Sequence, residues 1–320
     1  MSSKILRSIG LLAVGTISGV SLTHLYIKTA QEPANAVEFS RRSRTDPTVR
    51  PDDTNYDFDP AKFLQYGVPG PVADQRIAHG YMSVFDRRTR NPYYTAETIT
   101  EELLEQRKGN RKYSEFHVDS NIPEMFQAKL SDYRGSGYDR GHQTPAADCK
   151  FSQEAMNDTF LLSNMCPQVG DGFNRNYWAY LEEWCRSLTK KYESVSIMTG
   201  PLYLPQKNER GQWEVRYRMI GNPPNVAVPT HFFKVIIAKE KGKDSMKPAV
   251  AAFVLPNKPI ADNFPLKNFL VPVEVVERSS GLEILQKVPK SNRQELCKQI
   301  ECKLNAKAFL EEVQRKQNKS

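Results

Sequence analysis

The chain has 320 residues, of which 39% are hydrophobic, and its formal net charge is +8. About 250 residues lie between the first sixty and the last ten, which is enough for one large domain with its own core. We find no internal repeat, and this excludes a repeat architecture. Many soluble enzymes are equally basic, so the charge permits polyanion binding but does not by itself indicate it.

The N-terminal segment predicts a membrane anchor. The nineteen residues Ile9–Ile27 contain no Asp, Glu, Lys or Arg, and a stretch of this length can cross a bilayer as a helix. Lys4 and Arg7 precede it, so the N-terminus is expected on the positive-inside side and the body of the protein on the other. Ala34–Ala36 has the small-residue pattern of a signal-peptide cleavage site, so a secretory signal is the alternative.

The segment that follows the anchor predicts a flexible linker. Residues 32–60 are rich in Arg, Asp, Pro and Asn and show no sustained apolar period. We place the folded domain at residues 61–310 and a basic tail at residues 311–320.

Within the domain, short apolar or β-branched runs predict strands and longer periodic segments predict helices. The predicted strands are a hairpin of Tyr81–Phe85 with Tyr93–Thr95, followed by Val195–Met198, His231–Ala238 and Ala249–Leu255. The predicted helices are Ser152–Asp158, Asn176–Lys191 and Gln294–Cys302. This order indicates an α+β fold with a mixed, largely antiparallel sheet.

Two polar segments carry the residues that point to chemistry. Tyr138–His142 ends a predicted strand, and Asn174–Trp178 follows about thirty residues later. A histidine can accept a proton from water near neutral pH, an arginine neutralises phosphate, and an asparagine carbonyl is a hard oxygen ligand for Mg²⁺. These functions together are what metal-assisted phosphodiester hydrolysis requires.

The predicted helix after Asn174 has two distinct faces. An apolar stripe is formed by Trp178, Leu181, Cys185 and Leu188. Asn174, Glu182 and Arg186 follow at multiples of four residues and share a neighbouring face. The alternative interpretation is that Glu182 and Arg186 form an ordinary surface pair at i,i+4 spacing.

These segments resemble the DNA/RNA non-specific nucleases with a ββα-metal active site, in particular the fungal mitochondrial members of that family. The resemblance covers about residues 63–302. It rests on Asp139–His142 with Pro145–Ala146, Leu162–Met165 with Pro167–Gln168, Asn174–Glu182, Thr199–Pro201 and Val228–Pro229.

The resemblance implies a role for each polar residue of these segments. His142 would be the general base, and such a base must be neutral, with one ring nitrogen oriented by an acceptor. Asn174 would hold Mg²⁺, for which Mn²⁺ could substitute, and Glu182 would hold waters bound to the metal. Arg140 and Arg186 would contact the phosphate. For Arg140, an ion pair at the edge of the core is the alternative.

Two further residues are implied as substrate contacts by the same resemblance. Arg111 matches an upstream arginine of the family, and Asn164 lies in the Leu162–Met165 segment. For Asn164 a buried amide that satisfies a loop is the alternative. Asp139 is expected to be structural.

The resemblance also implies the substrates and the location. DNA and RNA would both be cut to products with 5′-phosphates, because only phosphate and sugar need be held. Residues 1–31 would target and anchor the protein in the mitochondrial inner membrane, with the body in the intermembrane space. A homodimer and a role in nucleic-acid degradation and cell death are implied as well.

Other classes of protein remain open at this point. A membrane-tethered nucleic-acid-binding protein without turnover, a secreted nuclease and a phosphoesterase for small substrates all share parts of the pattern. His117 and His231 have no neighbouring ligand at metal spacing, which argues against a zinc site. The five cysteines form no metal-binding pattern, and Cys297 and Cys302 could form a disulfide or remain thiols.

Overall fold

The computed structural model of the protein describes residues 70–242 and 247–317. The predicted anchor Ile9–Ile27 and the predicted linker at residues 32–60 lie outside these ranges. Among the described residues, we find no helix with both the length and the apolar character that crossing a membrane requires.

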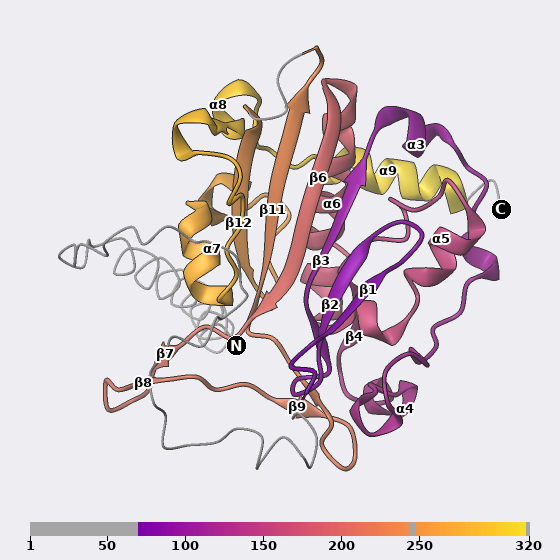
Figure 1. Ribbon diagram of the computed structural model, residues 1–320, viewed down its shortest axis with the longest axis vertical. Helices are drawn as coiled ribbons and strands as arrows, with labels where there is room; N and C mark the ends of the chain where they lie inside the picture. Colours follow the sequence, from indigo (N-terminus) through magenta and orange to yellow (C-terminus); the bar gives the residue numbers. More distant parts are fainter. Residues whose placement is uncertain (1–69, 243–246, 318–320) are drawn as a thin grey trace, which may run out of the picture.

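An eight-stranded sheet forms the centre of the domain (Figure 1). Its strands run in the order β1-β2-β3-β6-β11-β12-β13, and β14 pairs in parallel with β12 while the other pairs are antiparallel. The strands are β1 (Asp74–Ile77), β2 (Met82–Asp86), β3 (Asn91–Ile99), β6 (Tyr192–Leu202), β11 (His231–Glu240), β12 (Ala249–Pro256), β13 (Leu270–Val271) and β14 (Gln294–Glu295). The predicted α+β class with a mixed, largely antiparallel sheet is confirmed.

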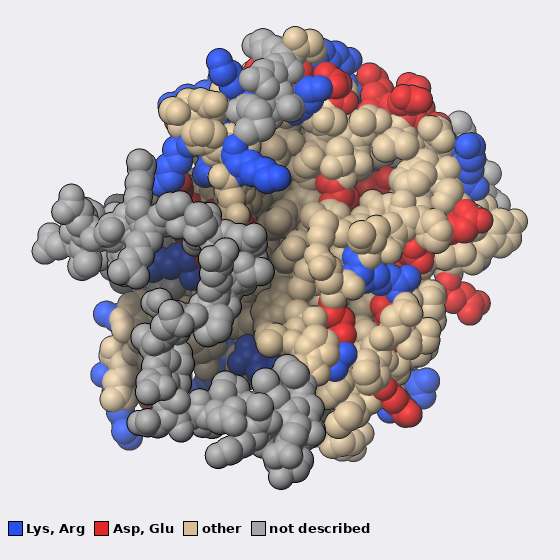
Figure 2. Space-filling model, in the orientation of Figure 1, with Lys and Arg blue, Asp and Glu red and all other residues tan. Residues whose placement is uncertain are grey.

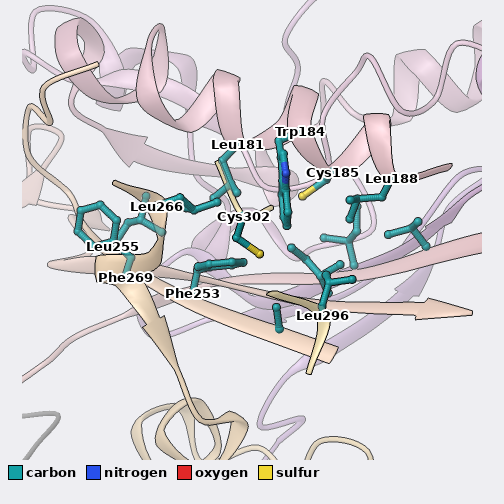
Figure 3. Packing of buried hydrophobic residues seen from close by; sticks show 14 of the residues in the cluster. Leu181, Trp184, Cys185, Leu188, Phe253, Leu255, Leu266, Phe269, Leu296 and Cys302 are labelled. Atoms are coloured by element: carbon teal, nitrogen blue, oxygen red, sulfur yellow. The ribbon is translucent and has the colours of Figure 1, made fainter. Parts of the chain in front are cut away.

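Helices cover both faces of the sheet. In Figure 1, α6 (Tyr177–Ser187) lies behind the central strands and α7 (Val273–Ser280) lies in front of them. Figure 3 shows side chains of α6 pointing onto the sheet, where Leu181 and Trp184 meet Phe253 of β12 in one buried cluster. Side chains alternate between the two faces of a strand. The neighbouring residues Val254 and Val235 therefore belong to a second cluster, under α7.

A separate hairpin precedes α6 and completes a ββα arrangement. The strands β4 (Asp139–His142) and β5 (Met165–Gln168) are antiparallel, with His142 opposite Met165. The chain between them contains α5 (Gln153–Asp158) and the turn η3 (Leu162–Asn164). After β5, the turn η4 (Gly170–Asn174) leads into α6. Asn174 therefore enters the helix next to the strand that carries His142.

Most of the remaining elements are short. They are α3 (Glu101–Glu105), η1 (Arg111–Tyr113), η2 (Glu124–Phe126), α4 (Leu130–Tyr133), η5 (Leu188–Lys190), β7 (Gln206–Lys207), β8 (Trp213–Glu214), β9 (Met219–Ile220), β10 (Val226–Ala227), η6 (Leu266–Phe269), η7 (Lys290–Asn292), α8 (Leu296–Gln299) and α9 (Ala306–Gln317). On the face drawn in Figure 2, acidic side chains lie mainly on the side of α3 and β1–β3, so this face is not uniformly basic.

The predicted hairpin, the three later strands and the first two helices are confirmed, although β6 is longer than expected and α6 ends at Ser187. The single helix predicted over Gln294–Cys302 is wrong. Gln294 and Glu295 pair with β12, and only Leu296–Gln299 is helical, because the edge of the sheet offers the chain hydrogen bonds that a local pattern does not reveal.

The structure adds two observations on the C-terminal region. Cys297 and Cys302 form a disulfide, which decides between the two alternatives that the sequence left open. The segment taken for a basic tail from residue 311 continues α9 as far as Gln317. This helix packs on α6, where the rings of Phe309 and Tyr180 lie 5.0 Å apart.

Candidate active site

His142 is fixed by two aromatic rings at the end of β4. Its ring centroid lies 4.9 Å from that of Phe160, edge to face, and 5.6 Å from that of Phe116. Its Nε2 is buried, and no described group bonds to it. The acceptor that was expected to orient one ring nitrogen is therefore absent from the described residues, and ring packing holds the imidazole instead.

The environment of His142 keeps the imidazole neutral. Burial lowers the pKa of His142 to about 3, and the positive charges of Arg111 and Arg140 act in the same direction. This lowered pKa is what a general base that is neutral at neutral pH requires. A phosphate bound between the two guanidinium groups would offset their charge and raise this pKa, which would make the imidazole a stronger base when substrate is present.

Arg111 and Arg140 lie on the same two rings that hold His142. The Arg140 guanidinium carbon lies 4.3 Å from the centroid of Phe116, and that of Arg111 lies 5.2 Å from the centroid of Phe160. No carboxylate of the described chain forms an ion pair with either arginine. The alternative of a core-edge ion pair for Arg140 is therefore wrong. Two such cations beside a neutral histidine are suited to hold an anion.

Asn174 is oriented by Asp139. Its Nδ2 donates to Asp139 Oδ2 over 2.9 Å, and Arg175 donates to both oxygens of the same carboxylate over 2.8 and 2.7 Å. Burial raises the pKa of Asp139, but the hydrogen bonds from Arg175 and Asn174 outweigh it and leave the pKa below its ordinary value. The carboxylate thus stays charged and holds the amide so that Oδ1 points away from it. The structural role expected for Asp139 is confirmed.

Glu182 lies within α6, eight residues after Asn174 of η4, and is half-buried. Burial raises its pKa to about 7, while the charges of Lys234 and Arg186 oppose this rise. Arg111 also lowers the pKa of Glu182, so the charge of this arginine acts on both His142 and Glu182. The structure thus brings His142, Arg111 and Glu182 into one electrostatic environment.

Arg186 is engaged by carboxylates. It donates to Asp148 over 2.7 Å and to Glu183 over 3.0 and 2.9 Å. The i,i+4 pair with Glu182 that the sequence offered as an alternative is not formed, because the side chain turns toward Glu183 and Asp148. These contacts use three of the five N–H donors of the guanidinium, which leaves two for the phosphate contact predicted for Arg186. In this structure Arg186 anchors α6 to the loop after β4.

Asn164 does not face the site. Its side chain is fully buried, its Oδ1 accepts from the backbone of Thr144, and its Nδ2 donates to the carbonyls of Thr144 and Thr159. The prediction of a substrate contact is wrong, because every polar atom of this amide is already bonded. Asn164 instead fixes the loop that follows His142, which is the alternative that the sequence left open.

Sequence reasoning missed several residues that support the site. Phe116 and Phe160 hold His142, Asp148 holds Arg186, and the buried Lys234 influences Glu182. A lysine inside the apolar run His231–Ala238 was a usable signal, because lysine is almost never fully buried without a reason. The aromatic residues gave no such signal.

The residues present fit a magnesium ion held mainly by water. No cluster of three or more His, Cys, Asp or Glu side chains that could hold a metal occurs in the described ranges. Mg²⁺ retains several waters and needs only one or two protein oxygens. Asn174 offers one carbonyl oxygen in a fixed orientation, and Glu182 offers an acceptor for water. Cys149, Cys166 and Cys185 are buried thiols and take no part in such a site.

A comparison with protein families matches residues 59–291 to the family described as DNA/RNA non-specific endonuclease. Among curated proteins, "Nuclease 1, mitochondrial" of Schizosaccharomyces pombe is 72% identical over 317 residues, covering 99% of this chain and 98% of that protein. "Mitochondrial nuclease" of Saccharomyces cerevisiae is 50% identical over 312 residues, covering 97% and 94%.

An animal relative and a solved structure are also similar. "Endonuclease G, mitochondrial" of Homo sapiens is 42% identical over 221 residues, covering 69% of this chain and 72% of that protein. A chain of the solved EndoG/EndoGI complex superposes with a TM-score of 0.66 at 40% identity, covering 73% of this chain and 94% of that one.

Proposed function

This chain belongs to the DNA/RNA non-specific endonuclease family and is a nuclease, and we propose that it hydrolyses both DNA and RNA to 5′-phosphate products with Mg²⁺ as cofactor. One observation carries this proposal. A neutral histidine lies between two arginines that have no carboxylate partner in the described chain. This arrangement can bind a phosphodiester and remove a proton from water beside it.

His142 acts as the general base through Nδ1. Its other ring nitrogen, Nε2, is buried without a described partner, so we assign the lone pair that accepts the proton from water to Nδ1. The packing of Phe116 and Phe160 keeps the imidazole in one orientation while the proton moves. Loss of a general base typically lowers a rate about 10²–10⁴-fold.

Arg140 and Arg111 bind the scissile phosphate. Their guanidinium groups neutralise its charge, and each is held on an aromatic ring. Contacts to phosphate and sugar carry no sequence information, so this mode of binding accounts for cleavage of both nucleic acids. Arg186 takes part by positioning α6, through its ion pairs with Asp148 and Glu183.

Asn174 Oδ1 is the proposed ligand of Mg²⁺, with Asp139 holding the amide in place. A bound Mg²⁺ supplies positive charge that stabilises the departing oxygen. Glu182 accepts hydrogen bonds from water next to Asn174 and thereby orders the solvent of the site. Mn²⁺ offers a similar coordination chemistry and would substitute.

The protein is proposed to be mitochondrial, on the basis of the names of its relatives. Residues 1–31 would target and anchor it in the inner membrane, residues 32–60 would be the tether, and the catalytic body from residue 61 would stand in the intermembrane space. The anchor would keep the enzyme apart from mitochondrial and nuclear DNA until the enzyme is released. Release would then regulate its activity and connect it to cell death. Secretion remains the alternative location.

A homodimer is proposed from an exposed apolar surface in the segment that contains β8 and β9. Trp213, Val215, Tyr217 and Met219 are exposed by 48%, 53%, 42% and 42%. Two of these residues line a cleft of about 490 Å³. Apolar side chains gathered in this way are typical of protein interfaces, and a second copy of the chain is the partner that we propose.

His142→Ala should abolish cleavage of plasmid DNA and of RNA by residues 37–320, with a loss of at least about 10²–10⁴-fold, because the proton acceptor is removed. Binding of nucleic acid in EDTA should persist, since Arg111 and Arg140 remain. Near wild-type cleavage at pH 7 would remove His142 from the mechanism. Binding without any cleavage by the wild type would favour the alternative of a binding protein without turnover.

Asn174→Ala should raise the Mg²⁺ concentration needed for half-maximal activity at least about tenfold, because a proposed ligand is lost. Glu182→Ala should raise it less. The measurement is a Mg²⁺ titration of initial rates, with Asn268→Ala on the exposed surface as a matched control. An unchanged half-saturating concentration for Asn174→Ala would show that the ligand assignment is wrong.

Protease added to isolated mitochondria should digest the body only after the outer membrane is ruptured, if the anchor holds it in the intermembrane space. Deletion of residues 1–30 should release a soluble nuclease to other compartments. Protection until the inner membrane is also opened would place the body in the matrix. A product glycosylated at Asn157 or Asn318 would instead support secretion.

Val215→Glu combined with Met219→Glu should convert a dimer of residues 37–320 into a monomer, because charged side chains would be buried at the interface. Light scattering coupled to size exclusion measures the mass. Val72→Glu, at a residue that is 83% exposed elsewhere on the surface, is the control and should leave the mass unchanged. A wild-type monomer at micromolar concentration would contradict the proposal.

A further inference from the structure

A lysine and a glutamate are buried on the sheet face that α6 covers. Lys234 of β11 is 1% exposed and Glu97 of β3 is 5% exposed. Lys234 lies opposite Thr199 of β6, and its Nζ donates to Thr199 Oγ1 over 2.8 Å. A hydroxyl does not compensate the charge of an ammonium group, and a buried charge without compensation is unfavourable.

Helix α6 places Trp178 and Glu182 over this lysine. Lys234 Nζ lies 4.9 Å from the ring of Trp178, and Glu182 follows one turn later on the same helix. Burial raises the pKa of Glu182 to about 7, and among the charges that oppose burial the charge of Lys234 has the largest effect. Lys234 is thus close enough to influence whether Glu182 is ionised.

The charges in this interior divide into pairs. The groups that face Glu182 or its neighbours are Arg186 and Glu183 on α6, Asp148 in the loop after β4, Arg111 on η1, Lys234 on β11, Glu97 on β3 and the Cys185 thiol. Arg186 is already paired with Asp148 and Glu183. Burial raises the pKa of Glu97 well above its ordinary value, and the charge of Lys234 opposes this rise. Burial raises the pKa of the Cys185 thiol to about 12, so the thiol is neutral near pH 7.

Within the described ranges, these ion pairs leave Lys234, Glu97 and Glu182 without a direct charged partner. Lys234 forms no ion pair with a carboxylate in the described ranges, and Glu182 forms no described hydrogen bond or ion pair. Several buried polar atoms in the same interior have no described partner, namely both oxygens of Glu97, Asp148 Oδ2, Thr144 Oγ1 and Trp178 Nε1. Such atoms are usually satisfied by internal water, which can connect an ammonium to a carboxylate that it does not touch.

We propose, building on the role assigned to Glu182 above, that Lys234 is a positioning residue for the nuclease reaction, namely the buried counter-charge that keeps Glu182 a carboxylate. A carboxylate only accepts hydrogen bonds from water beside Asn174. A protonated carboxyl group would also donate a hydrogen bond and so disturb the arrangement of this water. Lys234 touches neither substrate nor metal. It acts through Glu182.

The test is the pH profile of kcat/KM at saturating Mg²⁺ for Lys234→Gln, which can still donate to Thr199 but carries no charge. The acid limb should move to higher pH by about 1–2 units, as expected for loss of a neighbouring opposite charge. Activity at pH 7 should fall about tenfold and recover at pH 9. KM should change little, and Lys234→Arg, which keeps the charge, should restore part of the activity at pH 7.

Two controls separate this role from a merely structural one. Thr199→Val removes the hydrogen bond but leaves the ammonium, and its acid limb should match that of the wild type. In a Glu182→Gln background, Lys234→Gln should have no further effect on the profile, because the group that it acts on is gone. If Lys234→Gln does not fold, as judged by circular dichroism, Lys234→Met serves for the same comparison.

An equal loss of activity at every pH for Lys234→Gln, or no loss at all, would overturn the inference and leave the role of Glu182 standing. Wild-type cleavage and an unchanged acid limb in Glu182→Gln would overturn both, because Glu182 would then not be the group whose ionisation the reaction needs. The two failures are therefore distinguishable.

Discussion

The packing of α6 on the central sheet is the constraint on which the rest of the site depends. Leu181, Trp184 and Leu188 are buried against the sheet in one cluster with Phe253. An α-helix turns 100° per residue, so burying this stripe fixes the direction of every other face. Glu182 is thereby held on one side of the helix, whereas Asn174 lies in η4, before α6 begins, and is held beside β4 by Asp139.

The arginines around the site differ in whether a carboxylate compensates their charge, and this difference indicates which of them can bind a phosphate. Arg111 and Arg140 lie on aromatic rings without a carboxylate partner in the described chain, so their charge is available to a phosphate. Arg186 is compensated by Asp148 and Glu183 and serves the scaffold instead. Arginines near the same site therefore differ in function, because the neighbouring carboxylates decide how much positive charge is left for a substrate.

Much of the support for the site comes from residues that perform no chemistry. Asp139 holds Asn174, and Asn164 bonds the backbone of the loop that follows His142. The disulfide between Cys297 and Cys302 lies in the segment that joins β14 to α9, and α9 in turn contacts α6. Such contacts restrict the side chains of the site before a substrate is bound, which lowers the entropy lost on reaching the reactive geometry.

The sequence by itself determined the fold class, most strands, α6 and the segments that hold His142, Asn174 and Glu182, because these depend on local periodicity and on short motifs. The partners of Arg186, the buried position of Asn164 and the place of Lys234 beneath Glu182 were decided only by the tertiary structure. Residues separated by 38 positions, as Asp148 and Arg186 are, meet through packing of whole elements. Local spacing shows which side chains share a face, but the burial and the charge that they meet there come from the rest of the chain.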